Sequence, residues 1–118
     1  MELGAFFKSI IEQDTSPVVV CNTEHKIIYM NPAAIKNYSK SGGAALIGKS
    51  ILDCHNNRSN DIIKSVVRSF IEDKDKNIVF THFNVKKNSD IYMVALRDDN
   101  GNLIGYYEKH ESRIREVG

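Results

Sequence analysis

Cys54 and His55 stand next to each other just before a run of turn and capping residues, Asn56 to Asn60. A histidine at the rim of a pocket can ligate a metal-bearing cofactor or form a hydrogen bond with a ligand. The alternative is structural: His55 or Ser59 caps the following helix, and Cys54 fills core volume. The residue types alone leave both interpretations open.

Further polar side chains are interspersed with Ile, Val, Leu and Met residues, where they could orient a small polar ligand. The guanidinium of Arg58 suits a carboxylate, although an arginine near a helix start is commonly at the surface. The alternation along residues 78–84 places His82 on the same strand face as Phe80, and that face is either a pocket wall or the outer surface. The candidate ligand-binding residues are Tyr38, Cys54, His55, Arg58, His82 and Tyr92.

Metal binding and catalysis have little support in the sequence. The two cysteines and four histidines show no paired metal-ligand spacing, so we expect no metal site. Gly43 to Ser50 has the spacing Gly-x-x-x-x-Gly-Lys-Ser of a phosphate-binding loop, but that loop follows a strand, whereas the helix that begins after Asn31-Pro32 is expected here. We therefore expect no catalytic residues and no enzyme activity.

The composition excludes several classes of protein. A length of 118 residues suits one domain, and the net charge of +1 gives no field that would attract nucleic acid or a membrane. No apolar run is long enough to span a bilayer, and no secretion signal precedes the first strand. Two cysteines make no disulfide framework, so we expect a cytoplasmic protein.

An amphipathic helix is predicted at the N-terminus, where large apolar residues recur at helical spacing. Either this stripe packs on its own domain, or it is shared with a second subunit. Phe6 and Phe7 are large for a helix at a chain end, which favours the second interpretation and a homodimer. The expected interface residues are Leu3, Phe6, Phe7 and Ile10.

The elements that follow predict an α+β fold. Asn31-Pro32 is typical of a helix start, apolar residues over 62–71 predict a longer helix, and Asn100-Gly101 is typical of a hairpin turn. To bury one apolar face, the strands must form a single five-stranded antiparallel sheet, with the central helices on one face. The predicted strands cover 18–22, 26–30, 78–85, 91–97 and 103–110.

Three segments in this order resemble the PAS domain family. Residues 22–34 resemble its first hairpin and Asn-Pro-Ala-Ala helix start, residues 46–53 its Gly-Lys segment, and residues 97–105 its Asp-x-x-Gly turn. Residues 54–59 resemble the Cys-His-x-x-x-Ser signature of a bacterial sensory subtype, with Asn56 where many of those domains have proline.

The resemblance implies a PAS-like sheet with helices around a central pocket, and a role in bacterial signal transduction or transcription regulation. It implies an unknown small-molecule ligand, dimerisation through the N-terminal helix, and a downstream signalling domain or protein. The alternatives are a ligand-free protein–protein interaction domain and a haem-binding sensor through His55. The expected division is a dimerisation helix over 1–14, a sensory domain over 15–111, and a tail or linker over 112–118.

The cofactor is unknown at this stage. Haem-binding members of the family often take their histidine from the long helix, and residues 62–71 contain none, so we expect weak or absent haem binding. Residues 54–58 do not resemble the segment of the photoactive flavin subgroup, so we do not expect flavin chemistry at Cys54.

Overall fold

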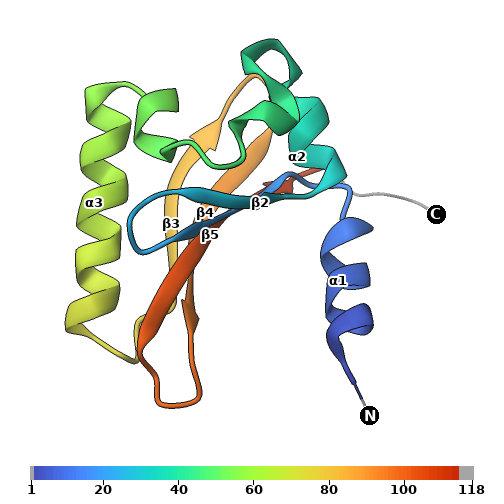
Figure 1. Ribbon diagram of the computed structural model, residues 1–118. Coiled ribbons are helices and arrows are strands. Elements are labelled where there is room, and N and C mark those ends of the chain that lie inside the picture. Colours follow the sequence, from blue (N-terminus) through green and yellow to red (C-terminus); the bar gives the residue numbers. More distant parts are fainter. Residues whose placement is uncertain (1, 115–118) are drawn as a thin grey trace.

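The computed structural model describes residues 2–114, which fold around one antiparallel sheet (Figure 1). The strands are β1 (Val18–Asn22), β2 (Ile27–Met30), β3 (Ile78–Asn84), β4 (Ser89–Arg97) and β5 (Leu103–Ser112). Their order is β2-β1-β5-β4-β3, so the first hairpin joins the last three strands through β1 and β5. The predicted five-stranded sheet is confirmed.

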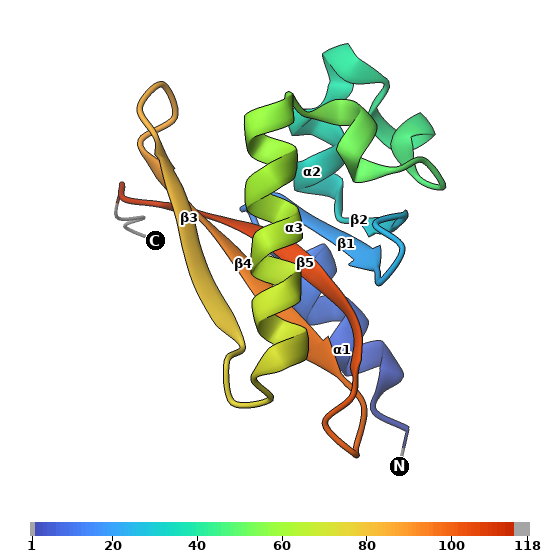
Figure 2. The ribbon, with the colours of Figure 1, turned by 90° about the vertical axis from the view of Figure 1, so that its left-hand side faces the viewer.

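Most helices cover one face of this sheet (Figure 2). They are α2 (Pro32–Asn37), the short 3₁₀ helices η1 (Ser39–Ser41), η2 (Gly43–Leu46) and η3 (Ile51–Cys54), and the long helix α3 (Asn57–Glu72). The N-terminal helix α1 (Gly4–Glu12) lies on the opposite side. No helix within residues 2–114 is long and apolar enough to cross a membrane. The fold is α+β, as expected.

Asn31 begins α2 as predicted, and it also joins three parts of the chain. Its Oδ1 accepts hydrogen bonds from the backbone N–H of Ala34 and of Val18, each at 2.9 Å. Its Nδ2 donates to the carbonyl groups of residues 11, 14 and 16, which end α1 and lead into β1. Since Asn31 is completely buried, this one side chain ties α1 and its linker to the sheet.

Helix α3 begins earlier than its apolar pattern, and its cap is Asn56. The Asn56 side chain accepts a hydrogen bond from the Ser59 N–H at 2.8 Å, so the interpretation in which His55 or Ser59 caps this helix is wrong. The ring of His55 instead contacts the Ile51 carbonyl oxygen through Nδ1 at 2.9 Å. The first turn of α3 is polar, which is why apolar spacing did not reveal it.

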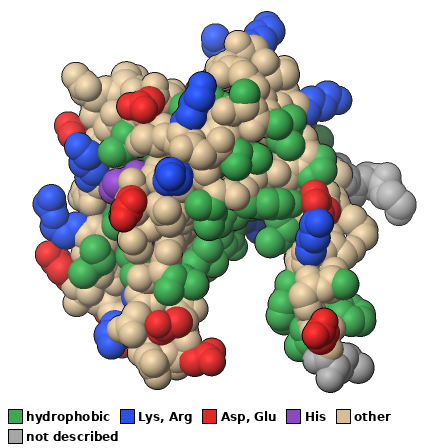
Figure 3. All heavy atoms as spheres, viewed as in Figure 1, with side chains coloured by type: hydrophobic (Ala, Val, Ile, Leu, Met, Phe, Trp, Pro, Cys, Tyr) green, Lys and Arg blue, Asp and Glu red, His purple; other side chains and the backbone are tan. Residues whose placement is uncertain are grey.

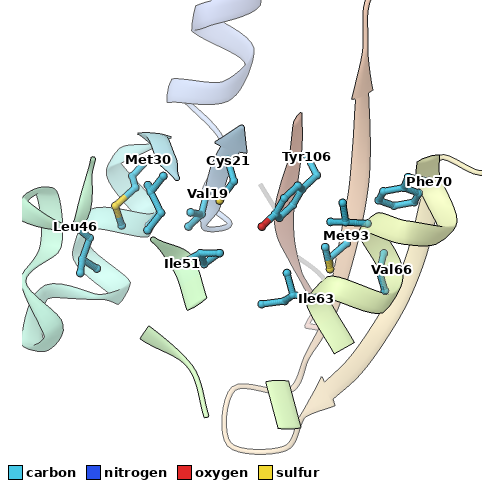
Figure 4. Packing of buried hydrophobic residues seen from close by; sticks show 13 residues of the cluster. Val19, Cys21, Met30, Leu46, Ile51, Ile63, Val66, Phe70, Met93 and Tyr106 are labelled. Atoms are coloured by element: carbon cyan, nitrogen blue, oxygen red, sulfur yellow. The ribbon is translucent and has the colours of Figure 1, made fainter. Parts of the chain in front are cut away.

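The core lies between α3, the 3₁₀ helices and the inner face of the sheet (Figure 4). Strand pleating divides the residues of β5: Tyr106 points into the core, while Tyr107 lies on the outer face, where it pairs with Val20 and Val94. Residues of the buried cluster include Val19, Cys21, Met30, Ile51, Ile63, Phe70, Met93 and Tyr106.

Strands β4 and β5 extend beyond the apolar residues that predicted them. Ser89 pairs with Ser112 across the two strands, so both polar residues belong to the sheet although their sequence is typical of a turn or tail. Pairing with a neighbouring strand stabilises such residues, and a single-sequence pattern does not contain that information. The expected boundary at residue 111 between domain and tail stays a prediction.

Candidate functional site: a buried carboxylate between two small pockets

Glu108 places a carboxylate in the interior of the domain. It lies on β5 between Tyr106 and His110, and the pleat turns all three side chains inward. Its Oε1 is 3.1 Å from Nε2 of His110 and accepts a hydrogen bond from the Tyr38 hydroxyl at 3.4 Å. No hydrogen bond to Oε2 is present within residues 2–114. Oε1 is therefore engaged by two side chains, while Oε2 is free in the described part of the chain and is not among the enclosed polar atoms that lack a partner.

The surroundings keep Glu108 ionised. Burial opposes the charged form, but the hydrogen bond and charge of His110, with smaller contributions from His55 and His82, outweigh it and hold the pKa of Glu108 below its usual value. Burial and then the charge of Glu108 raise the pKa of Tyr38, so this phenol stays protonated and can donate. The interior thus holds an anion with neutral and basic partners.

Two small pockets meet at Glu108 and His55, which line both. The α3 pocket is further lined by Ser59, Ile62, Ile63, Thr81, His82 and Met93. The β2 pocket is further lined by Val19, Ile27, Met30, Tyr38, Leu46 and Ile51. Their volumes are about 30 and 20 Å³, and a water molecule needs roughly 10–15 Å³ measured this way. In this conformation each pocket has room for about one or two waters.

The structure brings three of the predicted ligand-binding residues to these pockets. Tyr38 lines the β2 pocket, His82 lines the α3 pocket, and His55 lines both. Cys54 and Arg58 are exposed and line neither pocket.

Tyr92 is also absent from both pockets, because strand pleating turns it to the outer face of the sheet. There it packs edge-on against Phe80, with the ring centroids 5.7 Å apart. The sequence interpretation of Tyr92 as a pocket residue is therefore corrected.

His82 and Phe80 do not share a strand face. A bulge between them interrupts the alternation, so Phe80 pairs with Tyr92 on the outer face while His82 pairs with the buried Ile91. The extra residue at the bulge is Thr81, whose hydroxyl donates to the Ile91 carbonyl at 3.0 Å. This bulge brings His82 to the α3 pocket, and nothing in the period-two pattern predicts it.

Two buried groups of the site, Glu108 and His110, were missed as a pair by sequence reasoning. Alternation along the last strand does contain the signal, because residues 106, 108 and 110 must share one face. With the apolar Ile91 and Met93 as neighbours on β4, that face is the inner one. A polar pair on the buried face of a strand was the available clue.

Neither thiol of the chain is reactive, whether buried (Cys21) or exposed (Cys54). Burial raises the pKa of the Cys21 thiol to about 12, and burial with the Asp53 charge raises that of Cys54, so neither is a thiolate nucleophile near neutral pH. Among the described residues no three histidine, cysteine or acidic side chains lie close enough to hold a metal ion. Haem does not fit pockets of about 30 and 20 Å³.

Comparison with known proteins identifies the fold. Residues 15–108 match the family model described as PAS domain. The PAS domain of a protein from Colwellia psychrerythraea has a TM-score of 0.70 and 14% identity, with 94% of this chain and 97% of that chain covered. The PAS domain of Bordetella pertussis BvgS has a TM-score of 0.68 and 13% identity, with 94% and 86% covered.

A third solved structure is the Aer2 receptor from Vibrio cholerae, described as a dual PAS-heme oxygen sensor. It has a TM-score of 0.60 and 21% identity, with 84% of this chain and 95% of that chain covered. At these identities the likeness is one of fold. No curated protein sequence matches the chain significantly.

Proposed function

This chain belongs to the PAS domain family, and on that premise we propose that it is the sensory and dimerising module of a signalling protein. The observation that carries the sensory part is Glu108, a buried carboxylate with one unpaired oxygen beside two small pockets. A charged group that faces pockets from the interior of a domain is typical of a functional site. A bound donor would satisfy the free oxygen.

The pocket volumes limit what enters. Drug-sized ligands occupy roughly 300–1,000 Å³, whereas these pockets measure about 30 and 20 Å³. We infer that a water-sized donor binds without rearrangement, and that a larger ligand requires α3 and the 3₁₀ helices to move away from the sheet. Cys54 and Arg58, which are exposed already, are part of the proposal only as rim residues that would border such an opening.

The rival function is a ligand-free interaction domain, and the small pocket volumes favour it. Native mass spectrometry of freshly purified protein separates the two. A retained small molecule that is lost in Glu108→Gln supports the sensory function. The bare chain mass in both proteins, with no change on addition of cellular metabolite extract, would overturn it in favour of the rival.

Haem binding through His55 is the weaker alternative. Nδ1 of His55 contacts the Ile51 carbonyl, which leaves Nε2 for the pockets, but their volume does not admit a porphyrin. We expect no strong Soret band after reconstitution with haem. A band that is lost in His55→Ala would contradict this. We propose no catalytic residue and no flavin chemistry.

Helix α1 supports dimerisation as the way the signal is passed on. It has no buried residue, and its apolar side chains are far more exposed than a helix packed on its own domain would leave them. The exposed fractions are 46% for Leu3, 60% for Phe6, 57% for Phe7 and 69% for Ile10. Only a partner surface would bury them.

A groove between α1 and the outer face of the sheet offers that partner a place (Figure 3). Ile10 and Ile11 form one wall, and outer-face residues of β1, β4 and β5 form the other: Val18, Val20, Leu96, Tyr107 and Lys109. Its volume is about 290 Å³, and hydrophobic side chains line the notch visible in Figure 3. We infer that α1 of a second copy occupies this groove and that the chain is a homodimer. We further propose that the protein is bacterial and cytoplasmic, and that the dimer acts on a downstream signalling or transcription-regulating partner.

The dimer is tested by sedimentation of Phe7→Glu, which places a charge in the proposed interface and should lower the mass to that of a monomer. Lys8→Glu is the matched control, because Lys8 is an exposed neighbour outside the apolar stripe. A monomer mass in the unmodified protein would overturn the proposal.

A further inference from the structure

A polar pocket lies outside the core, at the end of the sheet where β4 and β5 pass beyond the helices. We call it the Ser89 pocket. It measures about 200 Å³, and its walls come from the linker between α1 and β1, the end of α2, the turn between β3 and β4, and the last residues of β5. Its volume is several times that of the α3 and β2 pockets, so it can hold a small ion together with water.

The lining of the Ser89 pocket consists mainly of hydrogen-bond donors. It includes the hydroxyls of Ser16, Ser89 and Ser112, the ammonium of Lys87 and the imidazole of His110, and no carboxylate. Lys87 donates one hydrogen bond to the Asn37 side chain, which joins the β3–β4 turn to α2 and leaves further Nζ protons for a ligand.

Ser89 shows that this lining is incompletely satisfied. Only 6% of the surface of this residue is exposed, and its hydroxyl has no hydrogen-bond partner in the part of the chain that the structure describes. Strand pairing places Ser112 directly opposite on the same face. A buried unpaired hydroxyl is destabilising, and an acceptor in the pocket would remove that penalty.

His110 forms the wall between this pocket and the interior. Nε2 is occupied on the inner side by Glu108 at 3.1 Å and Tyr38 at 3.5 Å. Nδ1, on the other edge of the ring, has no hydrogen bond within residues 2–114 and is the atom available to the pocket. An acceptor there would take a hydrogen bond from Nδ1, while Nε2 keeps its contact with Glu108.

The nearby carboxylates are otherwise engaged. Glu108 lies behind the His110 ring, and Asp14 accepts from the Ser16 N–H at 2.9 Å. Asp90 is paired with Arg113 at 2.8 Å, and Glu111 with Lys109 at 2.9 Å. Both of the latter lie on the opposite face from Ser89 and Ser112, because strand neighbours alternate. The pocket lining itself therefore holds hydrogen-bond donors and one positive charge, that of Lys87.

We propose that the Ser89 pocket binds a small oxyanion, phosphate or carboxylate, through Lys87, Ser89, Ser112 and His110. The ion would join the linker that follows α1 to the end of β5, the two places where the domain connects to its flanking segments. Through His110 it would also strengthen the pairing with Glu108, which couples this outer site to the interior. The proposal does not depend on a ligand in the α3 or β2 pocket.

The test is titration of the ¹⁵N-labelled full chain with inorganic phosphate and, separately, with acetate, at constant ionic strength and with chloride as the reference. We expect saturable shifts at the amides of Ser89, His110 and Ser112, and the two series identify which oxyanion is preferred. Lys87→Met should weaken binding by about tenfold or more, since a charge-assisted hydrogen bond contributes about 1.5–3 kcal/mol. Lys86→Met is the matched control, from the same turn but outside the pocket.

A second variant tests oxyanion binding without a change of charge. Ser89→Ala deletes the unpaired hydroxyl, so the unliganded protein should unfold at the same or a higher urea concentration while oxyanion affinity falls. Equal weakening by Lys86→Met and Lys87→Met would mean general screening and would overturn the site, as would shifts that do not saturate. Binding that is unchanged in both Lys87→Met and Ser89→Ala would also overturn it.

Discussion

Asn31 and Glu108 are both polar, both buried and both central to the domain, yet their hydrogen bonding differs. Every donor and acceptor of the Asn31 side chain has a backbone partner, and those partners come from α1, its linker, β1 and α2. Glu108 carries a charge, places one oxygen against Tyr38 and His110, and leaves the other beside two pockets. Asn31 thus connects parts of the fold, and Glu108 leaves a free oxygen at the candidate site.

The largest effect should come from Asn31→Ala. The change leaves backbone groups at residues 11, 14, 16, 18 and 34 without their partner in a buried place, so the free energy of unfolding should fall by about 3 kcal/mol or more. Urea denaturation measures it. Asn57→Ala, at the exposed first residue of α3, should change it by less than about 0.5 kcal/mol. Equal effects of the two substitutions would contradict the structural role of Asn31.

Substitution of Arg97 tests whether the charge of a polar group or the completeness of its hydrogen bonds decides its structural role. Its guanidinium binds the carbonyls of Phe70, Asp73, Lys76 and Gly101 and the side chain of Asn77, so this charge closes the end of α3. Arg97→Ala should lower the free energy of unfolding by about 2 kcal/mol, and Arg97→Lys should recover little because an ammonium cannot reach all these acceptors. Full recovery with lysine would show that charge alone matters.

Glu108→Gln should have a smaller effect at neutral pH, about 1 kcal/mol, because the amide keeps a hydrogen bond and its burial is less costly than that of a charge. Its clearer effect is on pH dependence. The pKa of Glu108 is lowered by folding, so its contribution is present above the unfolded value of 4.5 and is lost as the pH falls through the folded value.

The measurement is urea unfolding between about pH 6 and pH 3. The loss of stability with acid should be shallower in Glu108→Gln than in the unmodified chain. Glu72→Gln, which changes an exposed carboxylate at the end of α3, is the control and should leave the slope unaltered. Identical slopes in all three proteins would mean that Glu108 is not held ionised by its partners.

The smallest effects are expected at the rim. Cys54→Ser and Arg58→Ala change exposed side chains that line neither pocket, so each should alter the free energy of unfolding by less than about 0.5 kcal/mol. Thermal unfolding measures this. A large loss of stability in either variant would show that these exposed side chains contribute to the fold, as the buried Asn31 does.

Much of the fold could be predicted because its signals are local. Asn31-Pro32 predicted the start of α2, Asn100-Gly101 predicted the last hairpin, and apolar spacing identified the buried side of α3. The site was harder. Tyr38, His55 and His82 were expected from residue type, but the expected Tyr92 lies on the outer face, and Glu108 was not considered.

The sequence by itself determined the elements and the five-stranded antiparallel sheet, since capping, turn chemistry and periodicity act over a few residues. Only the tertiary structure decided which polar groups are buried and whether their hydrogen bonds are complete. A bulge at Thr81 turned His82 inward, and strand pairing set His110 between Glu108 and the Ser89 pocket. Alternation along the last strand does indicate that residues 108 and 110 share a face, but the bulge and the partners from other elements depend on contacts between residues far apart in the chain.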